Sequence, residues 1–232
     1  MRDAYEGRDS THILERDDGY SHDSSGAQYV ASFDEWNPHE KLAIARAKGR
    51  VLDVGCGAGR VALYLIELGH EVIGIDVSPG ALEVCKERGF GSVHLMSAET
   101  IDFPDETFDT VVLYGNNFGF LGFPNRVIDM LKQLHRVAKR DGIVLAATRN
   151  PLMTEKPEHL ALHARNRAQG RPPGLIRIRM KYEGQIGDWF DLLSVTEEEM
   201  AELGGKAGWK LSEIIRSDTE QPELYVGLLI KE

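Results

Sequence analysis

Residues 51–60 read Val51-Leu52-Asp53-Val54-Gly55-Cys56-Gly57-Ala58-Gly59-Arg60. An apolar run that ends in clustered glycines and continues into a helical pattern predicts a strand, a tight turn and a helix. Glycine lets the backbone turn sharply and approach a ligand closely, and the first turn of a helix offers unpaired N–H groups. The segment therefore predicts a ligand site at the carboxyl end of a strand.

The alternation of strand and helix continues on both sides of this motif. The expected helices cover residues 40–48, 58–68, 79–88 and 124–139, and the expected strands cover residues 50–54, 71–75, 92–95, 109–114 and 143–148. This order predicts a parallel sheet with helices on both faces and ligands at the carboxyl ends of the strands. Two last strands, residues 209–216 and 224–231, have a connection too short for a helical crossover, so we expect an antiparallel pair. The predicted fold class is α/β: a Rossmann-like, doubly wound, mostly parallel seven-stranded sheet with an antiparallel last strand.

Composition narrows the function classes. The chain has 232 residues, of which 42% are hydrophobic and 28% charged, and its formal net charge is −10. These values are those of a globular domain, and they exclude collagen-like, mucin-like and largely disordered chains. Proteins that bind nucleic acid through its phosphates carry a basic face, so the acidic balance argues against a nucleic-acid partner.

The cysteines and the apolar runs indicate the compartment. Cys56 and Cys85 lie far apart and form no Cys-x-x-Cys pair, which predicts neither a disulfide framework nor a metal site. The N-terminus has no secretory pattern, and the apolar runs fall short of the roughly 20 residues that span a membrane. We therefore expect a cytoplasmic protein that enters no membrane.

Two segments depart from the alternating pattern. Residues 1–39 form an acidic N-terminal arm, whose first 27 residues offer little for a packed core and are expected to be mobile or to dock late. Residues 151–194 form an insertion, expected to be a lid that selects the substrate. Within it Arg177 and Arg179 share one face of a predicted strand. They either form a solvated outer face or bind a substrate carboxylate or phosphate.

A carboxylate follows the second strand of the sheet. Asp76 lies about twenty residues after the glycine turn, where a carboxylate accepts both hydroxyls of a ribose. The dinucleotide fingerprint also fits one register, Gly57, Gly59 and Ala62. Charge separates the two interpretations, because Asp53 repels a pyrophosphate and attracts a ligand with an ammonium and a sulfonium.

Four motifs of the chain, in this order, resemble those of the class I S-adenosylmethionine-dependent methyltransferases. They are Val51–Arg60, Gly74-Ile75-Asp76-Val77-Ser78, Ser97-Ala98-Glu99 with Phe103-Pro104-Asp105-Glu106-Thr107-Phe108-Asp109, and Arg136–Val144. The resemblance covers residues 40–150 by motif and the rest by topology. It implies a methyltransferase domain over residues 40–232, with S-adenosylmethionine as cofactor and S-adenosylhomocysteine as product.

The resemblance also implies roles by position. Asp53, Gly55, Cys56 and Gly57 would line the methionine end of the cofactor; Asp76 would hold the ribose and Val77 would pack beside the adenine; Ser97, Ala98 and Glu99 would lie at the adenine edge; and Tyr114, Gly115 and Asn116 would close over the cofactor near the sulfonium. The family often has Asp at the position of Ser97, so the backbone or Glu99 would replace that contact. Nothing basic neighbours Cys56 in sequence, so we interpret it as a small filler rather than a nucleophile.

The segment Tyr114-Gly115-Asn116-Asn117-Phe118-Gly119 resembles a motif of small-molecule N-methyltransferases. It makes Asn117 a candidate substrate residue; the alternative is a loop turn, since Asn tolerates left-handed backbone angles. His159 and His163 lie four residues apart, but no Glu follows in a metalloprotease pattern, so no metal site is expected. We assign no catalytic residue and no oligomeric state.

Together these features predict methyl transfer to the nitrogen or oxygen of a small molecule by in-line displacement, which depends mainly on alignment and exclusion of water. A protein or RNA methyltransferase and a non-enzymatic protein that senses the cofactor remain as alternatives.

Overall fold

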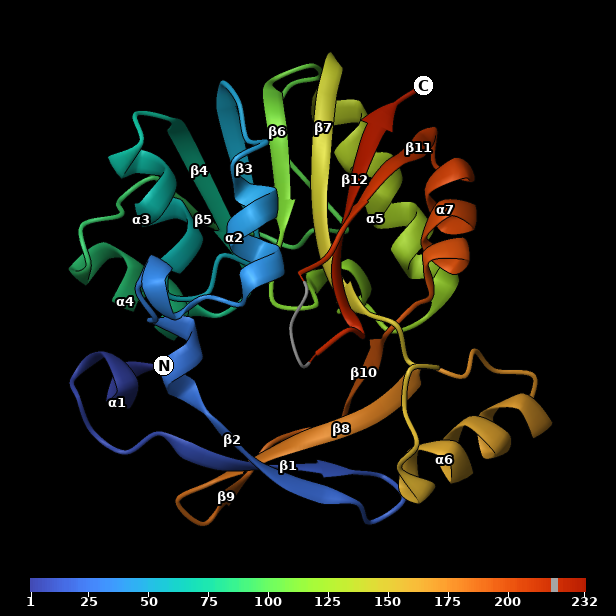
Figure 1. The fold of residues 1–232 in the computed structure, drawn as a ribbon. Helices are drawn as coiled ribbons and strands as arrows, with labels where there is room; N and C mark the ends of the chain where they lie inside the picture. The colour runs from blue at the N-terminus through green and yellow to red at the C-terminus, as the bar shows by residue number, and fades with distance from the viewer. Residues whose placement is uncertain (218–220) are drawn as a thin grey trace.

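The large sheet has the expected seven strands in a computed structural model, which describes residues 1–217 and 221–232 (Figure 1). Its strands are β3 (Arg50–Val54), β4 (Glu71–Asp76), β5 (Val93–Leu95), β6 (Phe108–Leu113), β7 (Ala138–Arg149), β11 (Trp209–Ile215) and β12 (Leu224–Lys231). They are ordered β11-β12-β7-β6-β3-β4-β5. Pairing is parallel from β5 to β7, whereas β12 runs antiparallel to both of its neighbours. The predicted fold class is confirmed.

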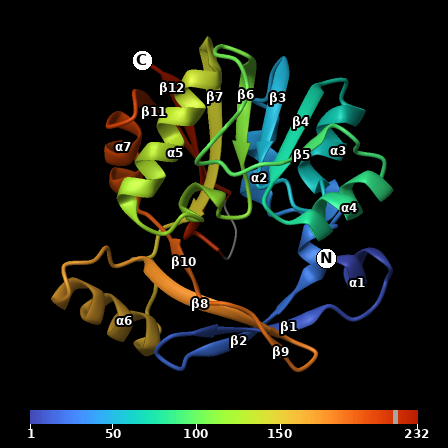
Figure 2. The same ribbon diagram turned by 180° about the vertical axis from the view of Figure 1, so that it is seen from behind.

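Helices cover both faces of this sheet (Figure 2). They are α2 (Pro38–Ile44), α3 (Arg60–Glu67), α4 (Pro79–Glu87), α5 (Pro124–Val137) and α7 (Glu197–Gly205). One apolar cluster joins the sheet to α2, α3 and α4, and a second joins it to α5 and α7. Adjacent residues of β3 show the division, because Val51 belongs to the first cluster and Leu52 to the second. A strand buried on both faces explains the continuous apolar runs in the sequence.

A second, smaller sheet is built from the N-terminal segment and the insertion. It contains β1 (Thr11–Arg16), β2 (Ser21–Ser25), β8 (Leu175–Tyr182), β9 (Gln185–Ile186) and β10 (Phe190–Leu193). The order is β10-β8-β1-β2, and β9 pairs with β8. All of these pairings are antiparallel.

Of the two expectations for the N-terminal arm, mobile or docked late, the structure has the arm docked through strand β1. Strand β1 lies between β2 and β8 and bonds to both of them. Glu15 lies directly opposite Arg179 in the register, and its carboxylate forms ion pairs with Arg179 and with Lys181. Glu15, one of the acidic residues that suggested a solvated arm, instead complements the basic strand of the insertion, which lies more than 150 residues away in sequence.

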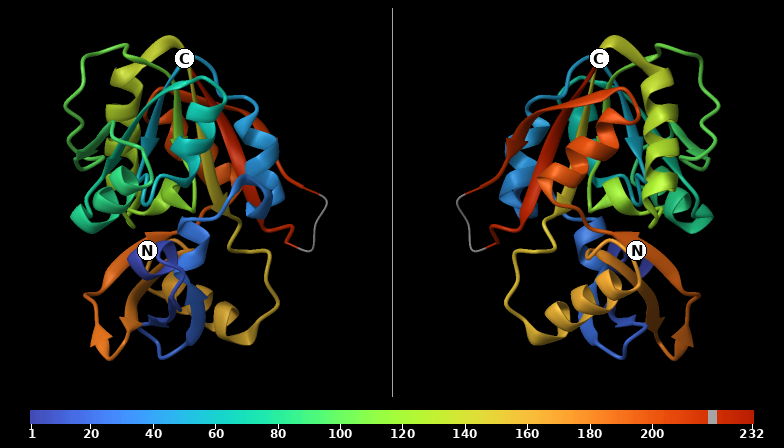
Figure 3. Two further views of the ribbon diagram at one scale, coloured as in Figure 1. Left: turned by 90° about the vertical axis from the view of Figure 1, so that its left-hand side faces the viewer. Right: turned by 90° about the vertical axis from the view of Figure 1, so that its right-hand side faces the viewer.

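The small sheet lies beyond the carboxyl ends of the parallel strands (Figure 3). Helix α6 (Pro157–Ala168) packs at one end of it, and α1 (Arg2–Tyr5) lies near the other end. Three short 3-10 helices complete the connections: η1 (Gly26–Tyr29), η2 (Phe33–Glu35) and η3 (Asn117–Gly119). None of the helices in the described ranges is both long and apolar enough to cross a bilayer.

Candidate functional site

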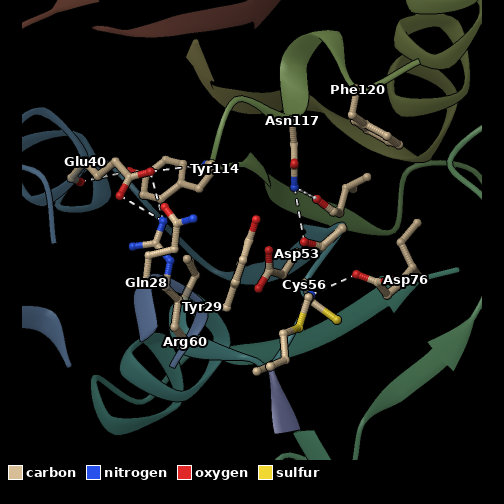
Figure 4. A pocket seen from close by; sticks show the side chains of 18 of the residues that line it. Gln28, Tyr29, Glu40, Asp53, Cys56, Arg60, Asp76, Tyr114, Asn117 and Phe120 are labelled. Carbon is tan, nitrogen blue, oxygen red and sulfur yellow. Dashed lines mark hydrogen bonds and ion pairs between the residues drawn. The ribbon is translucent and has the colours of Figure 1, made fainter. Parts of the chain in front are cut away.

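A cavity of about 380 Å³ opens beside the glycine turn that follows β3 (Figure 4). Its wall includes the following residues that the sequence singled out: Asp53, Gly55, Cys56, Gly57, Asp76, Val77, Ala98, Tyr114, Gly115 and Asn117. These residues come from the ends of β3, β4 and β6 and from the segment after β5. The cavity thus occupies the carboxyl edge of the sheet, where ligands bind in folds of this class.

The glycine turn is held by a side chain from another loop. The Asn117 side-chain amide donates hydrogen bonds to the carbonyl oxygens of Val54 at 2.9 Å and Gly55 at 3.1 Å. A Cβ on Gly55 would lie 2.6 Å from that amide nitrogen, and Gly55 has a φ of +70°. Only glycine fits this position without displacing Asn117. Asn117 therefore fixes the turn and lies in the cavity wall at the same time.

Asp53 is a buried carboxylate without a complete set of partners. Its side chain is 2% exposed, and Oδ2 has no hydrogen-bond partner among the described residues. Desolvation raises the pKa of Asp53 to about 7, opposed by the charge of Arg60 and reinforced by that of Asp76. A buried carboxylate oxygen that faces a cavity is suited to a cationic group of a ligand.

Asp76 ends β4 with its carboxylate at the edge of the cavity. Oδ2 accepts a hydrogen bond from the backbone N–H of Gly57 at 2.9 Å, and Oδ1 accepts one from Ser78 at 2.8 Å. A carboxylate accepts about four hydrogen bonds, so lone pairs remain for two ligand hydroxyls. The contact with Gly57 also links the ends of β3 and β4 across the cavity.

A buried ion pair that the sequence analysis did not identify forms another part of the wall. Arg60 Nη2 lies 3.0 and 2.9 Å from the two carboxylate oxygens of Glu40. Glu40, on α2, is 2% exposed and also accepts a hydrogen bond from the backbone N–H of Gly115. The guanidinium of Arg60 lies 4.9 Å from the centre of the Trp36 ring. The pair joins α2, α3 and the loop after β6 around the cavity.

The N-terminal segment also supplies part of the wall. The cavity residues from this segment are Met1, Gln28, Tyr29, Ala31, Glu35, Trp36, Asn37 and Glu40. No sequence signal pointed to Gln28. Arg60 had a detectable signal, because it directly follows the glycine motif. Figure 4 shows Gln28 and Tyr29 near Arg60.

Three predicted cofactor residues lie outside the cavity wall. Glu99 forms a two-pronged ion pair with Arg126 of α5, at 3.0 and 2.8 Å. Ser97 accepts a hydrogen bond from the backbone N–H of Glu99. Asn116 adopts a left-handed φ of 68° and accepts a hydrogen bond from the Thr148 hydroxyl at 2.7 Å. In this segment the wall is instead lined by Ala98, which lies between Ser97 and Glu99, and by Met96, which precedes Ser97.

The two arginines proposed from the insertion also lie outside the wall. Arg179 pairs with Glu15 and lies 4.4 Å from the centre of the Trp189 ring. Arg177 is exposed and lies on the same strand face as Arg179. The intervening Ile178 is 9% exposed, so the arginines occupy the more solvated face of the small sheet.

The cysteine and histidines considered as a nucleophile or metal ligands are Cys56, His159 and His163. A hydrogen bond with the Cys85 thiol and burial raise the pKa of the Cys56 thiol, so it stays protonated. His163 is buried on α6, and neither it nor His159 reaches the cavity. Throughout residues 1–217 and 221–232, no group of His, Cys, Asp and Glu side chains has the arrangement of a metal site.

This fold and this site define a class of protein. A seven-stranded sheet with β12 reversed, a glycine turn after β3, a buried acid before the turn and a carboxylate at the end of β4 are the features of a class I S-adenosylmethionine-dependent methyltransferase. The chain belongs to that family. The unpartnered oxygen of Asp53 in the cavity wall fits the cationic cofactor of this family, S-adenosylmethionine.

Comparison with known proteins agrees with this assignment. Residues 52–146 match the family described as a methyltransferase domain. A crystal structure of an S-adenosylmethionine-dependent methyltransferase from Bacteroides fragilis, in complex with S-adenosylhomocysteine, superposes with a TM-score of 0.82 and 25% identity. That alignment covers 99% of this chain and 91% of the other.

Two curated relatives match about half of this chain. The putative methyltransferase YqeM of Bacillus subtilis is 33% identical over 119 residues, which are 50% of this chain and 48% of the relative. A demethylmenaquinone methyltransferase of Anoxybacillus flavithermus is 37% identical over 114 residues, 45% and 46% of the two chains. The chain thus spans about half the length of the curated relatives it matches.

Proposed function

We propose that this protein transfers a methyl group from S-adenosylmethionine to a nitrogen or oxygen atom of a small-molecule acceptor. The observation that carries the proposal is the cavity wall, in which the glycine turn, the unpartnered Asp53 carboxylate and Asp76 lie together. A small acceptor is supported by the enclosure of this wall by the N-terminal segment. The relative described as a demethylmenaquinone methyltransferase is also named for a small-molecule acceptor.

The chain's own residues bind the cofactor in this proposal. Asp76 accepts hydrogen bonds from the ribose hydroxyls, and Asp53 compensates the ammonium of the methionine moiety. Val77 and Ala98 pack beside the adenine. Ser97 and Glu99 contribute only through the backbone around Ala98, because their side chains lie outside the wall.

When bound, the cofactor supplies an electrophilic methyl group on a sulfonium. The protein's part in such a displacement is alignment and exclusion of water. Trp36 and Tyr114, which are 3% and 4% exposed, add aromatic surface to the wall on the α2 side. An amine acceptor needs only to reach the site in its neutral form, and no cavity residue is assigned as a general base.

Calorimetric titration with S-adenosylmethionine, S-adenosylhomocysteine and NAD tests the cofactor. We expect binding of the first two ligands, loss of binding in Asp76→Ala, and no binding of NAD. Asp105→Ala provides a control, because Asp105 is an exposed carboxylate that pairs with Arg136 and lies outside the cavity. Binding of NAD alone would refute the proposal.

Formation of S-adenosylhomocysteine over a panel of small amines and hydroxy acids tests the transfer itself. Turnover of a small molecule supports the proposed activity. Turnover only with protein or RNA would show that the acceptor is a macromolecule and not a small molecule. Binding of the cofactor without turnover of any acceptor would favour a sensor of the cofactor.

A further inference from the structure

Arg149 is a cation at the carboxyl end of β7. Its side chain is exposed, and within residues 1–217 and 221–232 it makes no hydrogen bond, ion pair or ring contact. The preceding residue, Thr148, donates a hydrogen bond to Asn116, between the cavity residues Gly115 and Asn117. Arg149, which is not itself a wall residue, therefore directly follows a residue that is bonded to the loop of the cavity wall.

The direction of the Arg149 side chain follows from the alternation along β7. The residues of β7 that pack in the α2 cluster are Ile143, Leu145 and Ala147. Val144 and Ala146 belong to the opposite cluster. Because side chains alternate along a strand, Arg149 continues the row that faces α2, where Glu40 borders the cavity. Figure 1 shows that this end of β7 points toward the small sheet.

Side chains of the small sheet and α6 form an adjacent polar cluster. The Tyr20 ring lies 5.8 Å from the ring of His22 and 5.5 Å from that of His159. Arg16 lies 4.8 Å from the centre of the Tyr20 ring and donates a hydrogen bond to the backbone carbonyl of Glu158 at 2.8 Å. This cluster joins β1, β2 and the first turn of α6, the helix that follows β7 in the chain.

The positive charge of Arg149 acts on three histidines from three elements: His22 of β2, His39 of α2 and His159 of α6. Burial is the main cause that lowers the pKa values of His22, His39 and His159, and the charge of Arg149 lowers all three further. Arg16 and Lys156 act in the same direction on His22 and His159. The opposing carboxylates are Asp23, Glu158, Glu223 and Glu40. Of these, Glu40 is already paired with Arg60.

We propose that Arg149 binds an anionic group of the methyl acceptor, a carboxylate or a phosphate, at the edge of the cavity. This inference rests on the proposed function, because it assigns the substrate class of the same site. An arginine with an uncommitted guanidinium provides planar, two-pronged recognition of such groups. The sequence had placed this role on Arg177 or Arg179, which are not among the residues of the cavity wall.

The test uses the full chain saturated with S-adenosylhomocysteine, and benzoate, phenyl phosphate and neutral benzamide as probes in calorimetry. We expect saturable binding of benzoate or phenyl phosphate and at least tenfold weaker binding of benzamide. Preference between the two anions identifies the group as a carboxylate or a phosphate. Arg149→Gln should weaken binding of the anion about tenfold or more without changing affinity for S-adenosylhomocysteine.

Two variants keep the result interpretable. Arg140→Gln removes an exposed arginine from the opposite end of the same strand and should leave anion binding unchanged. Arg149→Lys keeps the charge without the planar fork and should retain part of the affinity, which separates recognition from misfolding. The inference is overturned if neither anion binds to the S-adenosylhomocysteine complex, if Arg149→Gln binds normally, or if Arg177→Gln alone loses binding. Failure to bind S-adenosylhomocysteine would instead refute the proposed function.

Discussion

A single guanidinium nitrogen of Arg60, Nη2, donates to both carboxylate oxygens of Glu40 at 2.9 and 3.0 Å, and the two side chains are 15% and 2% exposed respectively. This contact closes the cavity on the side of α2. It also orients the Gly115 backbone, since Glu40 accepts a hydrogen bond from that N–H. The pair is therefore both a stabilising contact and part of the site.

Removal of one partner of this pair should destabilise the protein. We expect Arg60→Met to lower the free energy of unfolding by about 3 kcal/mol, because it leaves the buried Glu40 carboxylate uncompensated. The double variant Glu40→Leu/Arg60→Met should lose less than the sum of the single losses. Urea unfolding measures both quantities. As a control, Glu213→Gln breaks the exposed Arg46–Glu213 pair of similar length and should cost less than about 1 kcal/mol.

The glycine turn should depend on Asn117. Asn117→Ala removes two hydrogen bonds to backbone carbonyls, so we expect a loss of about 1–2 kcal/mol of stability and weaker binding of S-adenosylhomocysteine. Asn117→Asp keeps the shape but places an acceptor against two carbonyl oxygens, so it should be at least as damaging as alanine. Thermal unfolding and calorimetry provide the readouts. An Asn117→Asp protein that behaves like wild type would contradict this role.

Asp53 should make cofactor binding depend on pH. Its pKa in the free protein is raised to about 7 by burial, so part of the population is protonated near neutrality. A ligand with an ammonium favours the carboxylate, so affinity for S-adenosylhomocysteine should rise about tenfold between about pH 6 and about pH 8. Asp53→Asn should bind more weakly and show no such rise. A wild-type affinity that is flat over this interval would contradict the prediction.

The same raised pKa has the opposite effect on the stability of the free protein. Folding favours the neutral acid, so this contribution is fully present below about pH 4 and is lost as the pH rises through about 7. The stability of wild type relative to Asp53→Asn should therefore fall over this interval. Denaturant unfolding at several pH values measures the difference. A constant difference would indicate that Asp53 stays ionised in the folded protein.

Hydrogen exchange should distinguish a docked N-terminal strand from a mobile arm. Strand β1 has bonded neighbours on both sides, so its backbone amides should exchange slowly, whereas the amide of Asp18, in the exposed turn that follows, has no backbone hydrogen bond among the described residues and should exchange quickly. Mass spectrometry of the peptides over residues 11–16 and 175–182 should show similar protection of the two strands. Rapid exchange over residues 11–16 alone would restore the mobile arm.

The sequence alone determined the large sheet, because its signals are local. Apolar runs, glycines at turns and caps such as Ser78, whose hydroxyl accepts a hydrogen bond from the Ala81 N–H, are encoded within a few residues of where they act. The same locality identified the glycine turn, Asp53 and Asp76 as residues of one site. Motifs at the carboxyl ends of neighbouring parallel strands must converge, whatever the details of packing.

Only the tertiary structure decided how the N-terminal segment meets the insertion. Residues 11–25 look like a solvated arm in isolation, because β8, the strand that pairs with β1 from the other side, lies more than 150 residues away. Alternation along β8 placed Arg177 and Arg179 on one face, but it did not say which face meets the cavity. Arg149 and Glu40 gave no local signal, since their roles depend on neighbours from other elements. Periodicity is a property of one segment, whereas the choice of partner face depends on contacts summed over the whole fold.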